Sequence, residues 1–369
     1  PDILFHFAIA SNGTGIENES WKINYEWTSE LAWLTKELNI KFLFTSTAMV
    51  FTDFAKGPFT KNSIPDAKEG YGFEKMRAEE RAVQQNQNTY IARLGWQIGE
   101  EFEGNNMLAY CENEYKKNGK IEASGKWYPA CSFVTDTVRE LFRIVTEEEP
   151  GLYMLDSNDR YTFFQIVSLL NNIYKNRWTV EENDNFVFEQ RMVDYAVKIP
   201  KLSERFKIIE YIHNKKWVDG GKFHNEIKMV YNGKGEHFKE SGNMADVCYT
   251  PAHLNEAYSD KRRGDGKCAV KWIYSEQAGT EENFLTKNLS LVHDTVLEPF
   301  GCIGEHIHTE DDEVYYVIEG EADISVIDVN ERVETKRVRT GDAHAVRKGE
   351  RHFVCAGRFG VLLIVTAVR

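Results

Sequence analysis

Several patterns are missing from this 369-residue sequence, and each absence argues against a class of protein. There is no run of 18 apolar residues and no visible signal peptide, so we expect no membrane-spanning helix. The formal net charge is −13, which argues against nucleic acid as a main partner because phosphates need a basic surface. The six cysteines include no CxxC pair, a pattern typical of reduced thiols. Together these features predict a cytoplasmic protein.

A glycine-rich strand–helix turn of the GxGxxG or GxxGxxG type is also missing. Such a turn places a helix N-terminus against the pyrophosphate of a dinucleotide. The one glycine pair near the start is Gly13 and Gly15, which follows a predicted strand at residues 1–7. The usual signal for a bound dinucleotide is therefore absent.

The segment 41–75 has the pattern of a ligand-binding strand, loop and helix. Residues 42–44 are a short apolar run typical of a buried parallel strand. Three hydroxyl residues (45–47) follow at its C-terminal end, where open α/β sheets bind ligands. Tyr71 and Lys75 are four residues apart and share one face of a predicted helix. An ammonium beside a phenol lowers the pKa of the phenol from about 10, which suits carbonyl reduction. The alternative is a surface tyrosine and lysine at helical spacing.

An ordered set of motifs extends this pattern over residues 1–205. The motifs are Ser46-Thr47, Val50-Phe51, Pro58-Phe59-Thr60, Tyr71 to Lys75, Ala92 to Trp96, and Asn105-Asn106-Met107. Together they resemble the extended short-chain dehydrogenase/reductases, in particular the dTDP-4-dehydrorhamnose reductase-like, sugar-nucleotide-binding branch. The resemblance implies that Thr47 orients a sugar 4-keto group, that Tyr71 protonates it, and that Lys75 lowers the pKa of Tyr71. It also implies NADP or NAD as cofactor, contacted by Ser46, Tyr71 and Lys75.

The same resemblance implies the residues that contact a nucleotide-sugar substrate. These are Trp96, Asn105, Asn106 and, in a late segment that can hold the diphosphate, Arg191. For Trp96 the alternative is a core or lid aromatic, and for Arg191 it is an ordinary surface arginine.

The family's glycine-rich first strand–helix turn has no counterpart here. The strand predicted at residues 1–7 resembles the fourth strand of the family's sheet, so the dinucleotide half is missing or lies outside this sequence. Two alternatives stay open. Either the chain is part of a longer protein, or cofactor binding has been lost or weakened.

The last eighty-odd residues have an all-β pattern that places metal-ligating residues together. Strands are predicted at 289–297, 313–318, 322–326 and 361–368. Strand alternation puts His306 and His308 on one face, Glu313 begins the next strand, and His352 can return from a later one. Three imidazoles and one carboxylate suit Fe, Mn, Ni, Co or Zn with open positions. The alternative is solvated side chains on a small barrel, and nearby His344 is either a partner of the ligands or a turn residue.

These residues resemble the two motifs of the cupin family. The first motif is HxHxxxxE with Gly320 seven residues after the glutamate, and the second is Gly341-Asp342 followed by a histidine. The resemblance implies a β-barrel (jelly roll) and a homodimer formed through the cupin.

We therefore expect an α/β plus all-β fold, a partial Rossmann-like doubly wound sheet followed by a cupin barrel. The predicted domains are a reductase-like domain at 1–207, a junction and cupin N-terminal extension without helical period at 208–284, and the cupin at 285–369. The first functional hypothesis is an NAD(P)H-dependent reductase of a 4-keto-6-deoxy nucleotide-sugar, fused to a metal cupin of the same pathway. The alternatives are a catalytically silent scaffold with a metal-dependent cupin isomerase, epimerase or dioxygenase, and a carbohydrate-binding module.

Overall fold

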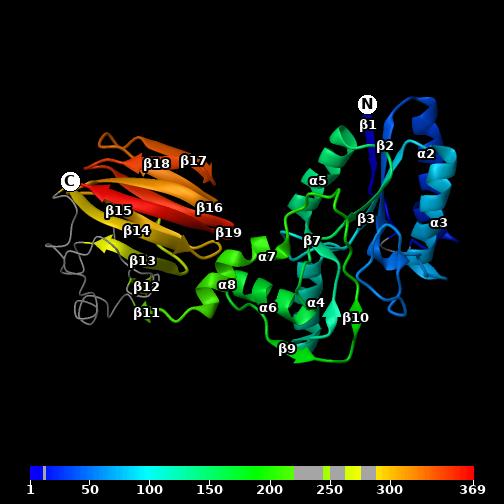
Figure 1. Cartoon of the computed structure of the whole chain (residues 1–369), viewed down its shortest axis with the longest axis horizontal. Helices are drawn as coiled ribbons and strands as arrows, with labels where there is room; N and C mark the ends of the chain where they lie inside the picture. The colour runs from blue at the N-terminus through cyan, green and yellow to red at the C-terminus, as the bar shows by residue number, and fades with distance from the viewer. Residues whose placement is uncertain (11–13, 220–243, 250–261, 276–287) are drawn as a thin grey trace. The chain divides into compact units, whose positions relative to one another are not determined.

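The chain divides into two compact units, Pro1–Arg205 and Phe206–Arg369 (Figure 1). The computed structural model describes residues 1–10, 14–219, 244–249, 262–275 and 288–369. The first unit is α/β and the second is built on one large, mostly antiparallel sheet, which confirms the predicted fold class. Among the described residues, no helix is long and apolar enough to span a membrane.

A four-stranded parallel sheet organises the first unit. Its strands, in spatial order, are β1 (Ile3–His6), β2 (Lys41–Thr47), β3 (Thr89–Leu94) and β8 (Leu152–Leu155). The apolar run predicted as a buried strand at 42–44 lies in β2, and both β2 and β3 are almost fully buried. A parallel sheet of this kind needs apolar cover on both faces.

Helices provide that cover. Those that pack on the sheet are α2 (Trp27–Glu37), α3 (Gly70–Gln85) and α5 (Val134–Glu147). The unit also contains α1 (Glu19–Trp21), α4 (Met107–Asn118), α6 (Phe163–Ile173) and α7 (Leu202–Arg205), with a π-helical turn at Lys22–Glu26 and a 3-10 turn at Ala48–Val50. Phe42 and Phe44 point to the face covered by α2 and α3, whereas Leu43 points to the face covered by α5, as strand alternation requires.

The first unit also contains three short strand pairs, two of which supply residues to the larger cavity described below. They are β4 (Trp96–Ile98) with β7 (Cys131–Phe133), β5 (Ile121–Ser124) with β9 (Val180–Asn183), and β6 (Trp127–Tyr128) with β10 (Phe188–Glu189).

The described residues of the second unit form a nine-stranded sheet. Its strands are β11 (Val218–Asp219), β12 (Ala245–Tyr249), β13 (Cys268–Ser275), β14 (Leu289–Leu297), β15 (Cys302–Ile307), β16 (Asp312–Ile327), β17 (Val333–Arg339), β18 (Ala343–Val346) and β19 (Arg351–Val368). β19 is central, because it pairs with β14, β15 and β16. Part of the segment predicted as a junction and cupin N-terminal extension, residues 208–284, lies outside the described residues.

The long strand β16 corrects the prediction of two separate strands at 313–318 and 322–326. The chain stays in one strand because Gly320 forms an irregularity in the pairing with β19 instead of a turn. Gly320 has φ +90°, and a Cβ there would lie 2.3 Å from the carbonyl oxygen of Gly360, so only glycine fits this close approach. The strand predicted at 361–368 is likewise the second half of β19.

A helix, α8 (Lys207–Asn214), corrects the expectation that no helical period follows residue 208. Ile208, Ile209 and Ile212 are buried on one side of α8. Ile208 and Ile212 pack against Ala269 and Val296 of the sheet. The helix is about two turns long, and the apolar spacing of so short a helix is difficult to recognise in a sequence.

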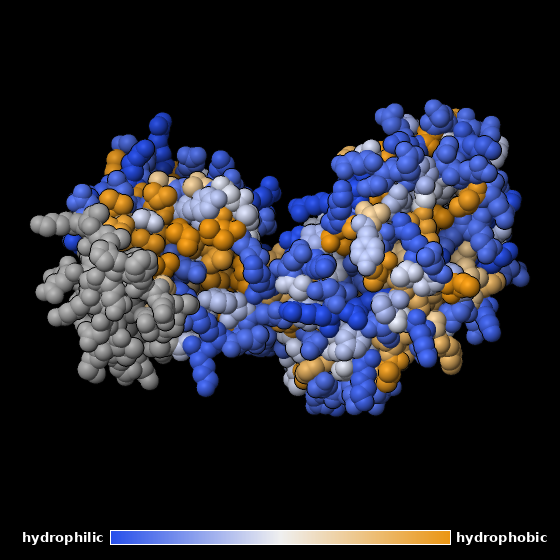
Figure 2. All heavy atoms as spheres, in the orientation of Figure 1, coloured by the Kyte–Doolittle hydropathy of each residue, from blue (hydrophilic) through white to orange (hydrophobic). Residues whose placement is uncertain are grey.

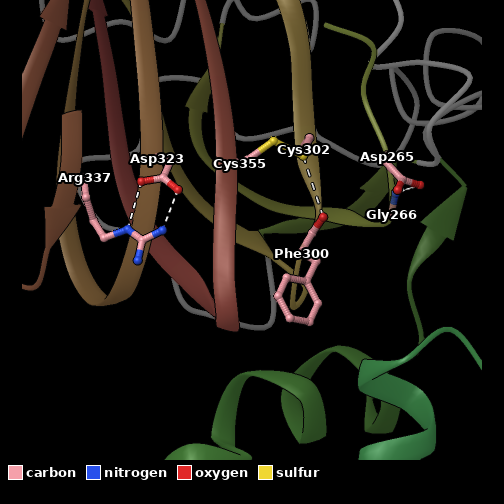
Figure 3. The surroundings of a disulfide bond; sticks show 7 residues. All are labelled: Asp265, Gly266, Phe300, Cys302, Asp323, Arg337 and Cys355. Atoms are coloured by element: carbon pink, nitrogen blue, oxygen red, sulfur yellow. Dashed lines mark hydrogen bonds and ion pairs between the residues drawn. A yellow bond between two sulfur atoms is a disulfide. The ribbon is translucent and has the colours of Figure 1, made fainter. Parts of the chain in front are cut away.

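A disulfide joins Cys302 of β15 to Cys355 of β19, which shows that the prediction of reduced thiols is wrong for this pair (Figure 3). The two residues are directly opposite each other in the antiparallel pairing, with their Cα atoms 4.1 Å apart. They are 53 residues apart in the sequence, so their spacing gave no sign of the contact. The other four cysteines form no disulfide.

Candidate functional site

A cavity of about 950 Å³ lies at the carboxyl end of the parallel sheet. Five of the predicted site residues line it: Ser46, Thr47, Tyr71, Trp96 and Asn105. They come from the end of β2, the first turn of α3, β4 and the loop before α4. Open α/β sheets bind ligands at this end, so the position suits a substrate cavity.

Close packing of α3 against the segment after β2 brings Tyr71 and Thr47 to the same cavity. A Cβ on Gly72 would lie 2.0 Å from the carbonyl oxygen of Met49, so only glycine lets the helix approach this closely. The hydroxyl of Thr47 accepts a hydrogen bond from the N–H of Met49 at 3.1 Å. That bond fixes the Thr47 side chain beside the helix.

An ion pair holds the same helix to the neighbouring strand. The guanidinium of Arg93 on β3 donates two hydrogen bonds to the carboxylate of Glu79 on α3, at 2.9 and 2.7 Å. Both side chains are buried, and such bidentate pairs fix geometry strongly. α3 is therefore positioned by β3 as well as by the segment after β2.

Lys75 lies behind Tyr71 and is fully buried. Its Nζ is 4.4 Å from the ring centroid of Phe44 and 5.9 Å from that of Tyr71, and it has no hydrogen-bond partner among the described residues. Burial lowers the pKa of Lys75 to about 7, because an ammonium loses its hydration there. Lys75 does not itself line the cavity.

The expectation that Tyr71 has a lowered pKa is wrong in this structure. Burial, together with the carboxylate of Glu74, raises the pKa of Tyr71 to about 12. The cause is desolvation of the phenolate, which the sequence pattern could not show. Tyr71 therefore holds its proton at neutral pH.

An aromatic wall closes another side of the cavity. The ring of Trp96 is stacked with the rings of Trp127 and Phe163, with centroid distances of 6.0 and 5.8 Å. Trp127, Phe186 and Gln190 also line the cavity, and the sequence analysis did not identify them. The signal for Trp127 and Phe186 is aromatic content near these positions, which does not distinguish the wall of a cavity from a core. A second cavity of about 590 Å³ shares Trp127 and Phe186.

Two predicted substrate residues lie outside the lining of the cavity. The side chain of Asn106 caps α4 by accepting a hydrogen bond from the N–H of Ala109 at 3.1 Å. The guanidinium of Arg191 donates to Glu189 at 2.8 and 2.7 Å and lies over the ring of Tyr128. Both side chains are held by local partners.

The second unit brings its four predicted ligand residues into one cluster. His306 of β15 lies opposite His352 of β19, His308 follows the end of β15, and Glu313 lies on β16. One ligand atom from each lies within 4.8 Å of the others. The Nε2 atoms of His306 and His352 are 3.0 Å apart, and Nε2 of His308 is 3.5 Å from Glu313 Oε2.

The electrostatics of this cluster fit a bound cation. Burial, with the neighbouring imidazole of His306, lowers the pKa of His308 to about 4 and that of His352 well below its ordinary value. Neutral imidazoles offer the lone pairs that metals need. Nε2 of His308 is buried without a hydrogen-bond partner, which a metal ion would supply. His344 lies in β18, not in a turn, and its ring stacks on Tyr315 at 4.5 Å.

The two units thus define a protein with a ligand cavity on a parallel α/β sheet and a His/Glu cluster in a β-domain. Residues 1–169 match the family model of the RmlD substrate binding domain, and residues 274–368 match that of the cupins. The chain therefore carries an RmlD substrate binding domain followed by a cupin domain. A comparison with curated proteins found no match.

Solved structures similar to each part were also found. A dTDP-4-dehydrorhamnose reductase of Bacillus anthracis, in complex with NADP, has 16% identity and a TM-score of 0.49 over 58% of this chain and 81% of that one. The corresponding enzyme of Clostridium acetobutylicum has 18% identity and a TM-score of 0.47 over 55% and 76%. A predicted oxalate decarboxylase of Thermotoga maritima has 16% identity and a TM-score of 0.28 over 36% and 97%.

Proposed function

We propose that the first unit reduces a 4-keto-6-deoxy nucleotide-sugar with NAD(P)H. The observation that carries the proposal is the common cavity of Thr47 and Tyr71 at the carboxyl end of β2. The match to the RmlD substrate binding domain supports a sugar-nucleotide as the ligand. The aromatic wall of Trp96 and Trp127 suits the apolar face of a sugar ring.

The roles of the residues follow from their chemistry. Thr47 orients the 4-keto oxygen through its hydroxyl, and Tyr71 donates its proton to that oxygen as the carbonyl is reduced. The raised pKa of Tyr71 keeps this proton in place until charge develops on the oxygen. The ammonium of Lys75, close behind the ring, stabilises the phenolate that remains. The nicotinamide, when bound, supplies the hydride.

The residues fit one end of the cofactor. The hydroxyl of Ser46, which lines the cavity, is buried without a hydrogen-bond partner among the described residues, and a ribose hydroxyl would satisfy it. Nζ of Lys75 is likewise buried without such a partner, behind Tyr71 and outside the lining. No glycine-rich turn for the pyrophosphate occurs in the sequence. The proposal therefore assigns Ser46, Tyr71 and Lys75 to the nicotinamide-ribose end only.

The edge strand β1 has room for the rest of a dinucleotide-binding sheet. In the described sheet β1 pairs with β2 alone, and the helices on either face carry exposed apolar side chains. These are Trp27 and Leu34 of α2, Leu38 directly after it, and Val138 and Phe142 of α5. Parallel sheets are normally covered on both faces, so a further α/β segment would bury this surface. NADPH binding by this chain, compared with that of a polypeptide extended at its N-terminus, separates an incomplete sheet from lost cofactor binding.

The Tyr71→Phe variant tests the reductase. We expect NADPH-dependent turnover to fall about 100- to 10,000-fold, because the proton donor is lost, while nucleotide-sugar binding measured by calorimetry stays unchanged. Tyr195→Phe, at a tyrosine that is 96% exposed, is the matched control. Undiminished turnover in Tyr71→Phe would refute the assignment.

We also propose that His306, His308, Glu313 and His352 bind a divalent transition metal (Fe, Mn, Ni, Co or Zn). The carrying observation is the mutual proximity of the four ligand atoms. Such a metal supplies Lewis-acid polarisation of a carbonyl, which suits an isomerase or epimerase of the same sugar pathway. Elemental analysis should find metal in the purified protein and not in His306→Ala/His308→Ala. Equal metal content in both would discard the ligand set.

The second candidate function is a silent reductase-like scaffold in which the cupin alone is active. The missing glycine-rich turn favours it. It predicts that neither this chain nor an N-terminally extended form binds NADPH, whereas the metal site is occupied. If the chain is instead a carbohydrate-binding module, we expect it to bind sugar without turnover at either site.

A homodimer through the cupin is a further proposal. Val314, Tyr316 and Ile318 alternate along the outer face of β16, and each is 40–45% exposed. Figure 2 shows apolar side chains gathered on the surface of this unit. We expect light scattering to give the mass of a dimer and Tyr316→Glu to give that of a monomer. A monomeric wild-type protein would contradict the proposal.

A further inference from the structure

A tyrosine stands beside the four ligand residues of the cupin. Tyr315 lies two residues after Glu313 on β16, so both side chains point to the same, inner face of the sheet. Its hydroxyl donates a hydrogen bond to Glu313 Oε2 and lies 3.2 Å from Nε2 of His352. The hydroxyl oxygen is therefore close to two of the four ligand atoms.

The ring of Tyr315 is held rigidly. It is 4% exposed and belongs to the apolar core of the second unit. His344 faces Tyr315 across the pairing of β16 with β18, and the two rings stack at 4.5 Å with an interplanar angle of 19°. Packing and strand pairing thus position the hydroxyl, which does not depend on a flexible loop.

Glu313 depends on this hydroxyl. Among the described residues, Tyr315 is the one that donates a hydrogen bond to the Glu313 carboxylate. Glu313 is 8% exposed, so little water can replace that bond. An unsupported carboxylate would rotate about its terminal torsion and present either oxygen, or both, to a cation.

We propose that Tyr315 is a positioning residue of the metal centre, whose hydroxyl fixes the Glu313 carboxylate for coordination. The inference rests on the proposed metal function. It adds a residue that is not a member of the His/Glu ligand set and that acts through one of the ligands. Partners that orient metal ligands typically contribute 10- to 100-fold to metal affinity.

The test is metal affinity of the full chain, measured by competition with a chromophoric chelator. Tyr315→Phe keeps the ring and its stack on His344 but removes the hydroxyl, and we expect about 10- to 100-fold weaker binding. Tyr316→Phe removes a hydroxyl from the outer face of the same strand and should bind like wild type. The visible spectrum of the Co²⁺-loaded protein should change in Tyr315→Phe only, because the geometry at cobalt changes.

A double-mutant comparison keeps the inference testable if Tyr315→Phe also loosens the fold. In a Glu313→Ala background the hydroxyl has no carboxylate to orient, so adding Tyr315→Phe should change affinity less than twofold. A tenfold further loss in that background, or wild-type affinity and spectrum in Tyr315→Phe, would overturn the inference. Wild-type protein that binds no metal would instead refute the proposed metal function itself.

Discussion

At the scale of single residues, Lys75 stands out because its ammonium is buried without a hydrogen-bond partner. Its Nζ makes cation–π contacts with the rings of Phe44 and Tyr71. Such an arrangement costs folding stability, and active sites often keep costly groups for their chemistry. The burial of Lys75 therefore fits a functional role better than a structural one.

The pH dependence of stability follows from the lowered pKa of Lys75. The pKa is about 7 in the folded protein and 10.5 in the unfolded chain, so between these values the unfolded chain binds one proton more. The free energy of unfolding should then rise with pH across this window and gain nothing from Lys75 below pH 7.

Replacing the lysine tests this reasoning. We expect Lys75→Met to stabilise the first unit by about 1–3 kcal/mol at pH 7, because an unpaired buried group is removed, and to flatten the rise toward pH 10.5. Urea unfolding at several pH values measures both effects. Lys68→Met is a suitable control because Lys68 is exposed. A destabilised Lys75→Met with an unchanged pH profile would contradict the account.

At the scale of elements, the disulfide connects the strands that carry two of the proposed metal ligands. Cys302 and His306 are on β15, and Cys355 and His352 are on β19. We expect reduction to lower the unfolding free energy of the second unit by about 2–4 kcal/mol. A Cys302→Ser/Cys355→Ser variant should not respond to the reductant. Thiol titration of the denatured protein should find four thiols before reduction and six after it. Six thiols before reduction would contradict the bridge.

Helices and strands that have a local sequence pattern were predictable from the sequence. Contacts that depend on how distant strands pair were not. β2 and α3 follow from the apolar run at 42–44 and from the spacing of Tyr71 and Lys75. The pairing of Cys302 with Cys355 depends on how two distant strands align, which no local pattern encodes. The same reason hides Tyr315, whose role depends on its contact with Glu313 and not on its own residue type.

At the scale of the whole molecule, each unit has its own hydrophobic core and its own candidate site. A ligand that binds one unit should therefore stabilise that unit alone. We expect calorimetry to show two transitions, and a chelator should lower only the one that belongs to the cupin. The loss should be about 3 kcal/mol if metal was present at one hundred times its Kd.

The variant that removes His306 and His308 is the control, since the chelator should leave both of its transitions unchanged. A shift of both transitions in the wild-type protein would mean that the two units unfold together.

The bridge between Cys302 and Cys355 also has a practical consequence for anyone who prepares this protein. Dithiothreitol added during purification would unlink the two histidine-bearing strands before any metal is measured. Samples handled with and without thiols would then differ in how firmly the ligands are held, so metal occupancies are comparable only between preparations of the same oxidation state.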